Sequence, residues 1–341
     1  MLTSAWHERG AVSTALLPLA ALFDTLARRR RRRLEASRAP APLPVLVIGN
    51  LTVGGTGKTP LVAAVATLCG ARGVRCGIVS RGYGGRAQRT PRSVRTDDDP
   101  AETGDEPLML HRLTGVPVVV CTARARAVEA LAARGDIDLV IADDGLQHYA
   151  MARSAEVCVI DARTGLGNGR SLPAGPLRER ADRLDEVDVI ALRGGDDPDA
   201  CPPGVPGWPA GPARGTFSLV PDGLVTLEGE RRELQGLHGL RAHAVAGIGR
   251  PQRLFDTLCE LGMDVVPHAF PDHHRYRERD LSFDEALPIV TTSKDAVKIA
   301  RLPRPPVEVL ELRMRTVLSA ALDTALGLLL ERLITETRTH R

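Results

Sequence analysis

The stretch IGNLTVGGTGKTP, residues 48–60, contains the residue types that bind phosphate groups in nucleotide-binding proteins. Three closely spaced glycines let a backbone curl so that successive N–H groups face an anion, and the helix that follows adds its positive N-terminal end. Lys58 would reach the β- and γ-phosphates of a nucleotide, and the hydroxyl of Thr59 would ligate Mg²⁺. The stretch therefore predicts a phosphate-binding loop between a strand and a helix.

One position departs from the most common form of this loop. The pattern G-x-x-x-x-G-K-[ST] would place a glycine where the sequence has Thr52. A glycine cluster that only makes a turn is the alternative, but lysine is rare in this chain. Only positions 58, 294 and 298 are lysine among 45 basic residues, and one of them fills the motif position. We expect the nucleotide to be bound by Thr52, Val53, Gly54, Gly55, Thr56, Gly57, Lys58 and Thr59.

A phosphate loop that works with a metal needs a carboxylate at the end of another strand. The run DLVIADDG places Asp143 and Asp144 directly after an apolar stretch. Adjacent aspartates could also be simple turn residues at a strand end. Mg²⁺ prefers carboxylates together with phosphate oxygens and water, so these two residues and Thr59 are the predicted metal ligands.

The elements that must position these residues alternate along the chain. Short, fully apolar runs such as VLVIGN, CGIVSRG and VPVVVC are separated by helical segments, which is typical of a parallel sheet covered on both faces. We predict an α/β protein with a mostly parallel sheet of the P-loop NTPase type and a second, smaller α/β lobe. The predicted divisions are an N-terminal helix in 1–38, a nucleotide-binding domain in 39–212 and the smaller lobe in 213–341. The smaller lobe should begin with an antiparallel hairpin, TFSLV and GLVTLEG, and end in a helix over 319–335.

The N-terminal segment combines apolar and basic residues. Residues 11–27 are mostly apolar, six arginines follow at 28–33, and Trp6 lies on the other flank. The apolar part is shorter than the ~20 residues that cross a bilayer, and its charge follows the apolar run, unlike a signal peptide. An ordinary amphipathic surface helix and a single-pass anchor are alternatives. We expect a helix that lies in the membrane interface, as in peripheral or monotopic proteins.

Composition argues against two other classes of protein. The net charge is only +3 and aromatic residues make up 3% of the chain, which leaves little material for a nucleic-acid surface. The six cysteines form no C-x-x-C pair, which is typical of free thiols in a reducing compartment. A regulatory P-loop NTPase that switches a partner remains an alternative on these grounds.

Seven motifs in a fixed order carry a family resemblance. They are GNLTVGGTGKTP, SRGYGG, GDEP, DDGLQH, LPAGPLRE, FPDHHRY and TSKDAVK. Together they closely resemble the tetraacyldisaccharide 4′-kinases, the lipid A 4′-kinases of Gram-negative bacteria, from the N-terminal helix to about residue 300. In that family serine or threonine also stands at the position of Thr52.

The resemblance implies a reaction and a location. The expected activity is ATP-dependent phosphorylation of the 4′-hydroxyl of a tetraacylated glucosamine disaccharide 1-phosphate, with Mg²⁺, in lipid A biosynthesis. The expected partners are ATP, the lipid disaccharide and the inner-membrane surface on its cytoplasmic face, with no nucleic acid and no obligate protein partner evident. Asp105 in GDEP resembles the catalytic base of the family and His273 its partner, alongside Lys58. A carboxylate oriented by an imidazole can accept the proton of a sugar hydroxyl.

Other motif residues are assigned less directly by the resemblance. GDEP alone could mark the start of a helix, and the histidines near 273 could indicate zinc, although the spacing lacks a second ligand pair. Asp272 could orient the imidazole or contact the metal shell, and Lys294 could serve the nucleotide or cap a strand. The expected acceptor-side and phosphate contacts are Tyr83, Glu106, Arg124, Gln147, His148 and Arg178.

Overall fold

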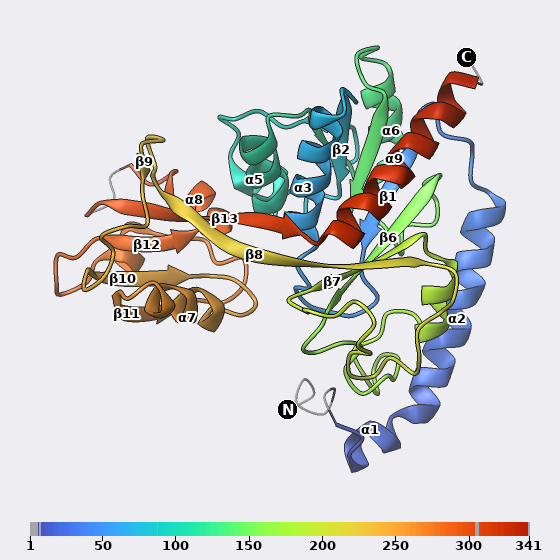
Figure 1. Ribbon diagram of the computed structural model, residues 1–341, viewed down its shortest axis with the longest axis horizontal. Coiled ribbons are helices and arrows are strands. Elements are labelled where there is room, and N and C mark those ends of the chain that lie inside the picture. The colour runs from blue at the N-terminus through green and yellow to red at the C-terminus, as the bar shows by residue number, and fades with distance from the viewer. Residues whose placement is uncertain (1–5, 7, 87, 304–306, 340–341) are drawn as a thin grey trace.

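The structure is a computed structural model that describes residues 6, 8–86, 88–303 and 307–339. Part of the predicted N-terminal segment, residues 1–5 and 7, lies outside the described residues. The described chain begins with helices α1 (Ala11–Ala15) and α2 (Leu17–Ala36), and α2 runs through all six arginines. Both lie against one side of the first lobe, away from the second (Figure 1). Among the described residues, no helix is long and apolar enough to cross a membrane.

The first lobe is built on parallel strands. Along the sheet, the order β7-β6-β1-β5-β2-β4-β3 places the phosphate-loop strand β1 between β5 and β6. Helices α3, α5 and α6 connect these strands and pack on the sheet (Figure 1). The elements are β1 (Val45–Gly49), α3 (Lys58–Ala71), β2 (Cys76–Ser80), β3 (Arg92–Ser93), α4 (Pro100–Thr103), α5 (Asp105–Thr114), β4 (Val118–Val120), α6 (Arg124–Ala132), β5 (Leu139–Asp143), β6 (Ala155–Asp161), a 3₁₀ helix (Ala181–Glu186) and β7 (Val189–Arg193).

The apolar runs of the sequence become strands because both faces of this sheet are buried. Every residue of β1, β2 and β5 is buried, as expected for strands that helices or loops cover on either side. Alternate strand residues enter two cores. One contains Leu46 and Ile48 with α3, and the other contains Val45 and Val47 with α6. The predicted α/β class with a mostly parallel sheet is confirmed.

The second lobe continues the same sheet. Its strands β10, β11 and β12 are parallel to one another, and β12 pairs with β13, so the sheet order here is β11-β10-β12-β13-β8. A separate core lies between β10 and helix α7. The elements are β9 (Arg231–Arg232), β10 (Arg241–Ala246), α7 (Gln252–Glu260), β11 (Asp264–Ala269), a 3₁₀ helix (Glu278–Leu281), β12 (Ile289–Thr292), α8 (Ser293–Ile299) and β13 (Val309–Leu318).

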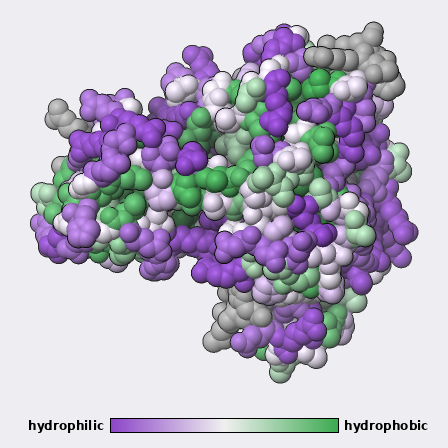
Figure 2. Space-filling model, viewed as in Figure 1, coloured by the Kyte–Doolittle hydropathy of each residue, from purple (hydrophilic) through white to green (hydrophobic). Residues whose placement is uncertain are grey.

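Two long strands join the lobes, and here one expectation is wrong. The predicted hairpin of TFSLV and GLVTLEG is a single strand, β8 (Ala213–Thr226), which pairs antiparallel with β13. Pro221 and Gly223 lie between the two predicted arms, and the pairing register shifts between Arg313 and Met314, opposite these residues. Such an irregularity lets proline stay in a strand although it has no N–H to donate. In Figure 1 both strands run from one lobe to the other, and hydrophobic side chains are visible around this crossing in Figure 2.

The last helix, α9 (Ala320–Thr339), returns to the first lobe. Leu322, Leu326 and Leu330 on one of its faces are buried in the core that also contains α3. The sequence predicted this helix over 319–335, close to its observed bounds. Helix α9 therefore packs beside the phosphate-loop helix α3 (Figure 1). The division of the chain into domains at residues 38 and 212 stays a prediction.

Candidate active site

The predicted phosphate loop connects β1 to α3, and the buried side chain of Asn50 supports it through hydrogen bonds. The Asn50 side-chain amide donates to the Thr52 carbonyl (2.8 Å) and to the Thr52 hydroxyl (3.2 Å). Its oxygen accepts a hydrogen bond from Lys58 Nζ at 2.9 Å. Thr52, which departs from the common motif, is therefore part of the support of the loop. Gly57 has φ of 93°, in the left-handed region that favours glycine, and Lys58 starts the helix directly after it.

The motif LPAGPLRE holds the other side of the loop. The backbone N–H of Val53 donates to the Pro176 carbonyl (2.9 Å), and that of Arg178 donates to the Leu51 carbonyl (2.7 Å). The side chain of Arg178 points to Asp144, with 3.4 Å between Nη1 and Oδ2. Two motifs that are more than 100 residues apart thus form one rigid structure around the loop.

The paired aspartates at the end of β5 differ in electrostatic environment. Burial, followed by the charges of Glu106 and Asp144, raises the pKa of Asp143 to about 7. Burial also disfavours ionised Asp144, but Lys58 at 3.4 Å and Arg178 hold the pKa of Asp144 below its ordinary value. Asp144 is therefore ionised at neutral pH. The ionised form of Asp143 would be favoured by a further cation nearby.

The residues around Asp143 fit a metal ion that is bound together with phosphate. Asp143 Oδ1 and the hydroxyl of Thr56 are buried, and neither has a hydrogen-bond partner among the described residues. Within the described part of the chain, no group of three His, Cys, Asp or Glu side chains could hold a metal ion by itself. Mg²⁺ takes few protein ligands and completes its shell with phosphate oxygens and water, so an orphaned carboxylate oxygen beside a phosphate loop suits it.

Two of the residues expected to contact phosphate, Arg124 and Gln147, also support the loop and the aspartates, and a third, His148, is held neutral. Buried Arg124 donates from Nη1 to the backbone carbonyl of Asp144 at 2.7 Å. The Gln147 amide donates to the Asn50 carbonyl and to Glu179, both at 3.1 Å. Burial, with the charges of Arg124 and other arginines, lowers the pKa of His148 to about 4, so its imidazole is neutral at pH 7.

Asp105 and His273 come together although 167 residues separate them in the chain. Asp105 is the first residue of α5 and is buried. Its Oδ2 lies 2.9 Å from His273 Nδ1, and its Oδ1 accepts the backbone N–H of Glu106. Lys298 Nζ is 3.7 Å from the same Oδ2. Asp105 therefore starts a helix and also pairs with the imidazole of His273.

Each member of this pair favours the charged form of the other. Burial raises the pKa of Asp105, but the hydrogen bond to His273 and the charges of Lys294, His273 and Lys298 hold it below its ordinary value. The hydrogen bond to Asp105 raises the pKa of His273, against the effect of partial burial. His273 has φ of 59°, and its backbone N–H donates to the Gly247 carbonyl. The ring itself is held by Asp105 at Nδ1 and by Lys294 at Nε2.

Lys294, whose role the sequence left open, lies next to this pair. Its Nζ is 3.2 Å from carboxylate oxygens of Glu106 and Asp272 and 3.3 Å from His273 Nε2. Burial opposes its charge, yet Glu106, Asp105 and Asp272 raise the pKa of Lys294. Lys298, to which the sequence assigned no particular role, contacts Asp295 at 2.7 Å and lies 3.7 Å from Asp105. All three lysines of the chain therefore belong to the site, and the rarity of lysine was the signal for all three.

The two halves of the site meet at Glu106. It bonds to Lys294 on the imidazole side, and its charge raises the pKa of Asp143 on the nucleotide side. Exposed Tyr83 lies over the same junction, with its ring centroid 4.9 Å from that of His273. The phosphate loop and the carboxylate–imidazole pair are therefore parts of one site.

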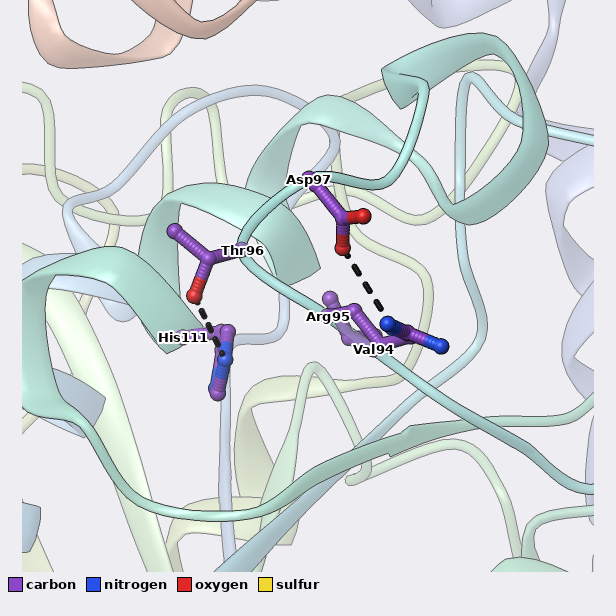
Figure 3. A pocket seen from close by; sticks show the side chains of 5 residues that line it. All are labelled: Val94, Arg95, Thr96, Asp97 and His111. Atoms are coloured by element: carbon purple, nitrogen blue, oxygen red, sulfur yellow. Dashed lines mark hydrogen bonds and ion pairs between the residues drawn. The ribbon is translucent and has the colours of Figure 1, made fainter.

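An open pocket lies elsewhere on the first lobe. Val94, Arg95, Thr96, Asp97 and His111 line an open pocket of about 490 Å³ (Figure 3). Its polar side chains contact one another in two pairs, Thr96 with His111 and Arg95 with Asp97. His111 is near the end of α5, whereas Asp105 is at its start, and a helix rises about 1.5 Å per residue. This pocket is therefore separate from the candidate active site.

A phosphate loop with paired aspartates, placed beside a carboxylate–imidazole pair on an α/β sheet, defines a P-loop phosphotransferase. The family model described as Tetraacyldisaccharide-1-P 4'-kinase matches residues 12–331. The chain belongs to this family.

Individual relatives agree over most of the chain. A tetraacyldisaccharide 4'-kinase of Pseudomonas aeruginosa (strain LESB58) is 49% identical over 303 residues, which is 87% of each chain. One of Alcanivorax borkumensis is 44% identical over 331 residues, which covers 94% of this chain and 96% of the relative. The crystal structure of LpxK from Aquifex aeolicus in complex with ATP is similar with a TM-score of 0.73 and 25% identity, over 96% of this chain and 99% of that one.

Proposed function

We propose that this protein is an ATP-dependent kinase that phosphorylates the 4′-hydroxyl of a tetraacylated glucosamine disaccharide 1-phosphate in lipid A biosynthesis. Family membership supports the reaction, and the solved relative carries ATP. The single observation that carries the proposal is the contact between Asp105 and His273 beside the phosphate loop. A nucleotide switch needs the loop, but it needs no pair that accepts a proton from a second substrate.

On the nucleotide side, the loop residues 52–59 bind the phosphates of ATP, and Lys58 is placed to reach the β- and γ-phosphates. Thr59, Asp143 and Asp144 would hold Mg²⁺. The ion, when bound, neutralises charge that builds up between the β- and γ-phosphates. Arg124, Gln147 and Arg178 act through the loop and Asp144, which they hold in place.

On the acceptor side, Asp105 accepts the proton of the 4′-hydroxyl as the sugar oxygen bonds to the γ-phosphorus and the bond to ADP breaks. Its lowered pKa keeps it ionised at neutral pH, and His273 and Lys298 hold the carboxylate in one orientation. Lys294 fixes Glu106 and Asp272 around the imidazole. Tyr83 is exposed over His273 and is placed to contact the sugar.

The proposed membrane contact is made by α1 and α2 on the cytoplasmic face of the inner membrane. Leu19, Leu22 and Leu26 lie on one side of α2 and are more than half exposed, and Val12 on α1 is similarly exposed. Arg29, Arg30, Arg32 and Arg33 follow and are exposed as well. An apolar face beside arginines suits anionic lipid headgroups, where a lipid with four acyl chains resides.

Transfer of labelled phosphate from ATP to the tetraacyl disaccharide 1-phosphate tests the function. The wild-type protein should label the lipid, with one ATP consumed per lipid phosphorylated. Asp105→Ala and His273→Ala should each reduce labelling, because general base catalysis contributes roughly 10²–10⁴-fold. Equal ATP consumption with and without lipid would support the switch instead. A wild-type protein that binds ATP and Mg²⁺ but labels no lipid would overturn the proposal.

A further inference from the structure

A second group of charged side chains lies beside the phosphate loop and has no role in the proposed mechanism. We call it the arginine cluster: Arg163, Arg193, Arg250 and Arg253 around the buried carboxylate of Asp161. Asp161 ends β6 and Arg193 ends β7 in the first lobe. Arg253 is in the first turn of α7 in the second lobe, and Arg250 lies just before that helix. The cluster therefore gathers around a point where the two lobes meet.

Both oxygens of the Asp161 carboxylate already have partners. Its Oδ2 lies 2.6 Å from Arg253 Nη2 and 3.8 Å from Arg250 Nη1. Its Oδ1 accepts the backbone N–H groups of Arg163 (3.2 Å) and Thr164 (3.3 Å). One negative charge thus lies among the guanidinium groups of Arg193, Arg250 and Arg253, and the cluster carries an excess of positive charge.

The positive charge of Arg193 is the least compensated in the arginine cluster. The Arg193 side chain is partly buried, and no hydrogen bond or ion pair joins its guanidinium group to the residues that the structure describes. Burial, with Arg253, Arg250 and Arg163, lowers the pKa of Arg193 to about 10, and Asp161 compensates only in part. A partly buried guanidinium with no carboxylate paired to it is poorly compensated, and a phosphate at this position would supply the missing negative charge.

The position of Arg193 connects the cluster to the nucleotide. A Cβ added at Gly57 would lie 2.5 Å from Arg193 Cδ and 3.1 Å from Arg193 Nε. The side chain therefore packs directly on the glycine that precedes Lys58. The strand order β7-β6-β1-β5 places it on the side of the loop opposite Asp143 and Asp144. The metal ligands approach the loop from one flank and the arginine cluster from the other.

We propose that the arginine cluster is a phosphate-binding subsite of the kinase, in which Arg193 is the primary contact and Arg250 and Arg253 reach the same anion from the second lobe. This rests on the proposed function. A planar guanidinium suits a phosphate oxyanion, with two parallel hydrogen bonds. The phosphate comes from ATP or from the 1-phosphate of the lipid, and contact with Gly57 favours the triphosphate of ATP.

The test compares ligands that differ in phosphate. Binding of ATP, ADP and adenosine is measured by calorimetry without lipid, for wild type, Arg193→Gln and Arg193→Lys. If the anion is the triphosphate, Arg193→Gln should weaken ATP binding by roughly tenfold or more and leave adenosine binding unchanged. Arg193→Lys should recover part of the loss. A similar loss for adenosine would show a contact to the nucleoside and would overturn the phosphate subsite.

A second arm covers the lipid. If ATP binding is unchanged, Arg193→Gln should raise KM for the lipid 1-phosphate roughly tenfold and remove the preference over an acceptor without the 1-phosphate. If Arg193→Gln changes neither the affinity for ATP nor the KM for the lipid, the proposed subsite is wrong. If the wild-type protein labels no lipid, the proposed kinase function itself is wrong.

Because Arg193 packs on the loop, its replacement could disturb folding. Arg250→Gln is therefore included, since this side chain is partly exposed and lies in the second lobe. Arg250→Gln should weaken binding of the same ligand by a smaller factor. Unchanged binding in a folded Arg193→Gln protein, or in Arg250→Gln, would contradict the proposal. Arg231→Gln is the matched control, because Arg231 is an exposed arginine of the second lobe that pairs only locally with Asp222 and Glu233.

Discussion

Lys58 contacts both groups that fix the nucleotide half of the site. Its ammonium bonds to Asn50, which supports the loop, and lies 3.4 Å from Asp144. We expect Lys58→Ala to reduce kcat/KM at least about 100-fold, since removing one donor that stabilises transition-state charge has an effect of this size. The labelled-ATP assay measures it. Wild-type rates in a folded Lys58→Ala protein would contradict the role of the loop.

The pairing of Asp105 with His273 predicts how stability depends on pH. The pKa of His273 is raised in the folded protein, so its stabilising contribution is fully present below the unfolded histidine value of about 6.5. The contribution is lost as pH rises through the folded pKa, where the imidazole becomes neutral in both states. Asp105→Asn removes the partner. The difference in melting temperature between wild type and Asp105→Asn should therefore narrow as pH rises from 6 to 9.

NMR titration of the His273 ring gives an independent measurement. In Asp105→Asn the pKa of His273 should fall toward or below the ordinary value, because the main cause of its elevation is gone while Lys294 remains. A melting-temperature difference that widens with pH, or an unmoved His273 pKa, would contradict the pairing.

At the scale of elements, α2 should determine membrane binding. Leu19, Leu22 and Leu26 share its exposed face, and burying a leucine in an apolar medium contributes roughly 1.5–3 kcal/mol. Replacing all three with glutamine should reduce binding to vesicles with anionic lipids more than tenfold, measured by co-sedimentation. Leu328→Gln is the control, since Leu328 is a comparably exposed leucine on α9. Equal loss in the control would contradict a specific role for α2.

The elements that sequence reasoning predicted well are those whose pattern is local. The buried strands around β1, the helix after the loop and the last helix all follow from apolar runs and their spacing. The hairpin prediction failed because Pro221 and Gly223 are turn residues by local rules, whereas their place in β8 depends on pairing with β13. Pairing between segments nearly 100 residues apart has no local signature.

The same limit explains which site residues the sequence could identify. Lys58 and Asp105 stand in recognisable motifs, and the rarity of lysine pointed to Lys298 as well. Nothing comparable marked Arg193, because arginine is common throughout this chain and the partners of Arg193 come from another lobe. Support roles were also hidden, so Gln147 and Arg124 were expected at phosphate but contact the loop and Asp144.

For the whole molecule, the continuous sheet predicts that both lobes unfold together. Strands β8 and β13 run through both, so one lobe cannot unfold without removing strands that pack on the other. Leu258 on α7 is fully buried in the core of the second lobe, and Leu258→Ala should cost about 2–5 kcal/mol. The two tryptophans of the chain, Trp6 and Trp208, both bond within the first lobe, to carbonyls of Pro173 and Asp199.

Tryptophan fluorescence therefore reports the first lobe while the substitution is in the second. We expect Leu258→Ala to lower the midpoint of the fluorescence transition as much as that of far-UV circular dichroism, because a shared sheet makes unfolding cooperative. Leu240→Ala is the control, since this leucine of the second lobe is partly exposed and should cost little. An unmoved fluorescence midpoint beside an earlier dichroism transition would mean that the lobes unfold separately, and that β8 and β13 connect them without coupling them.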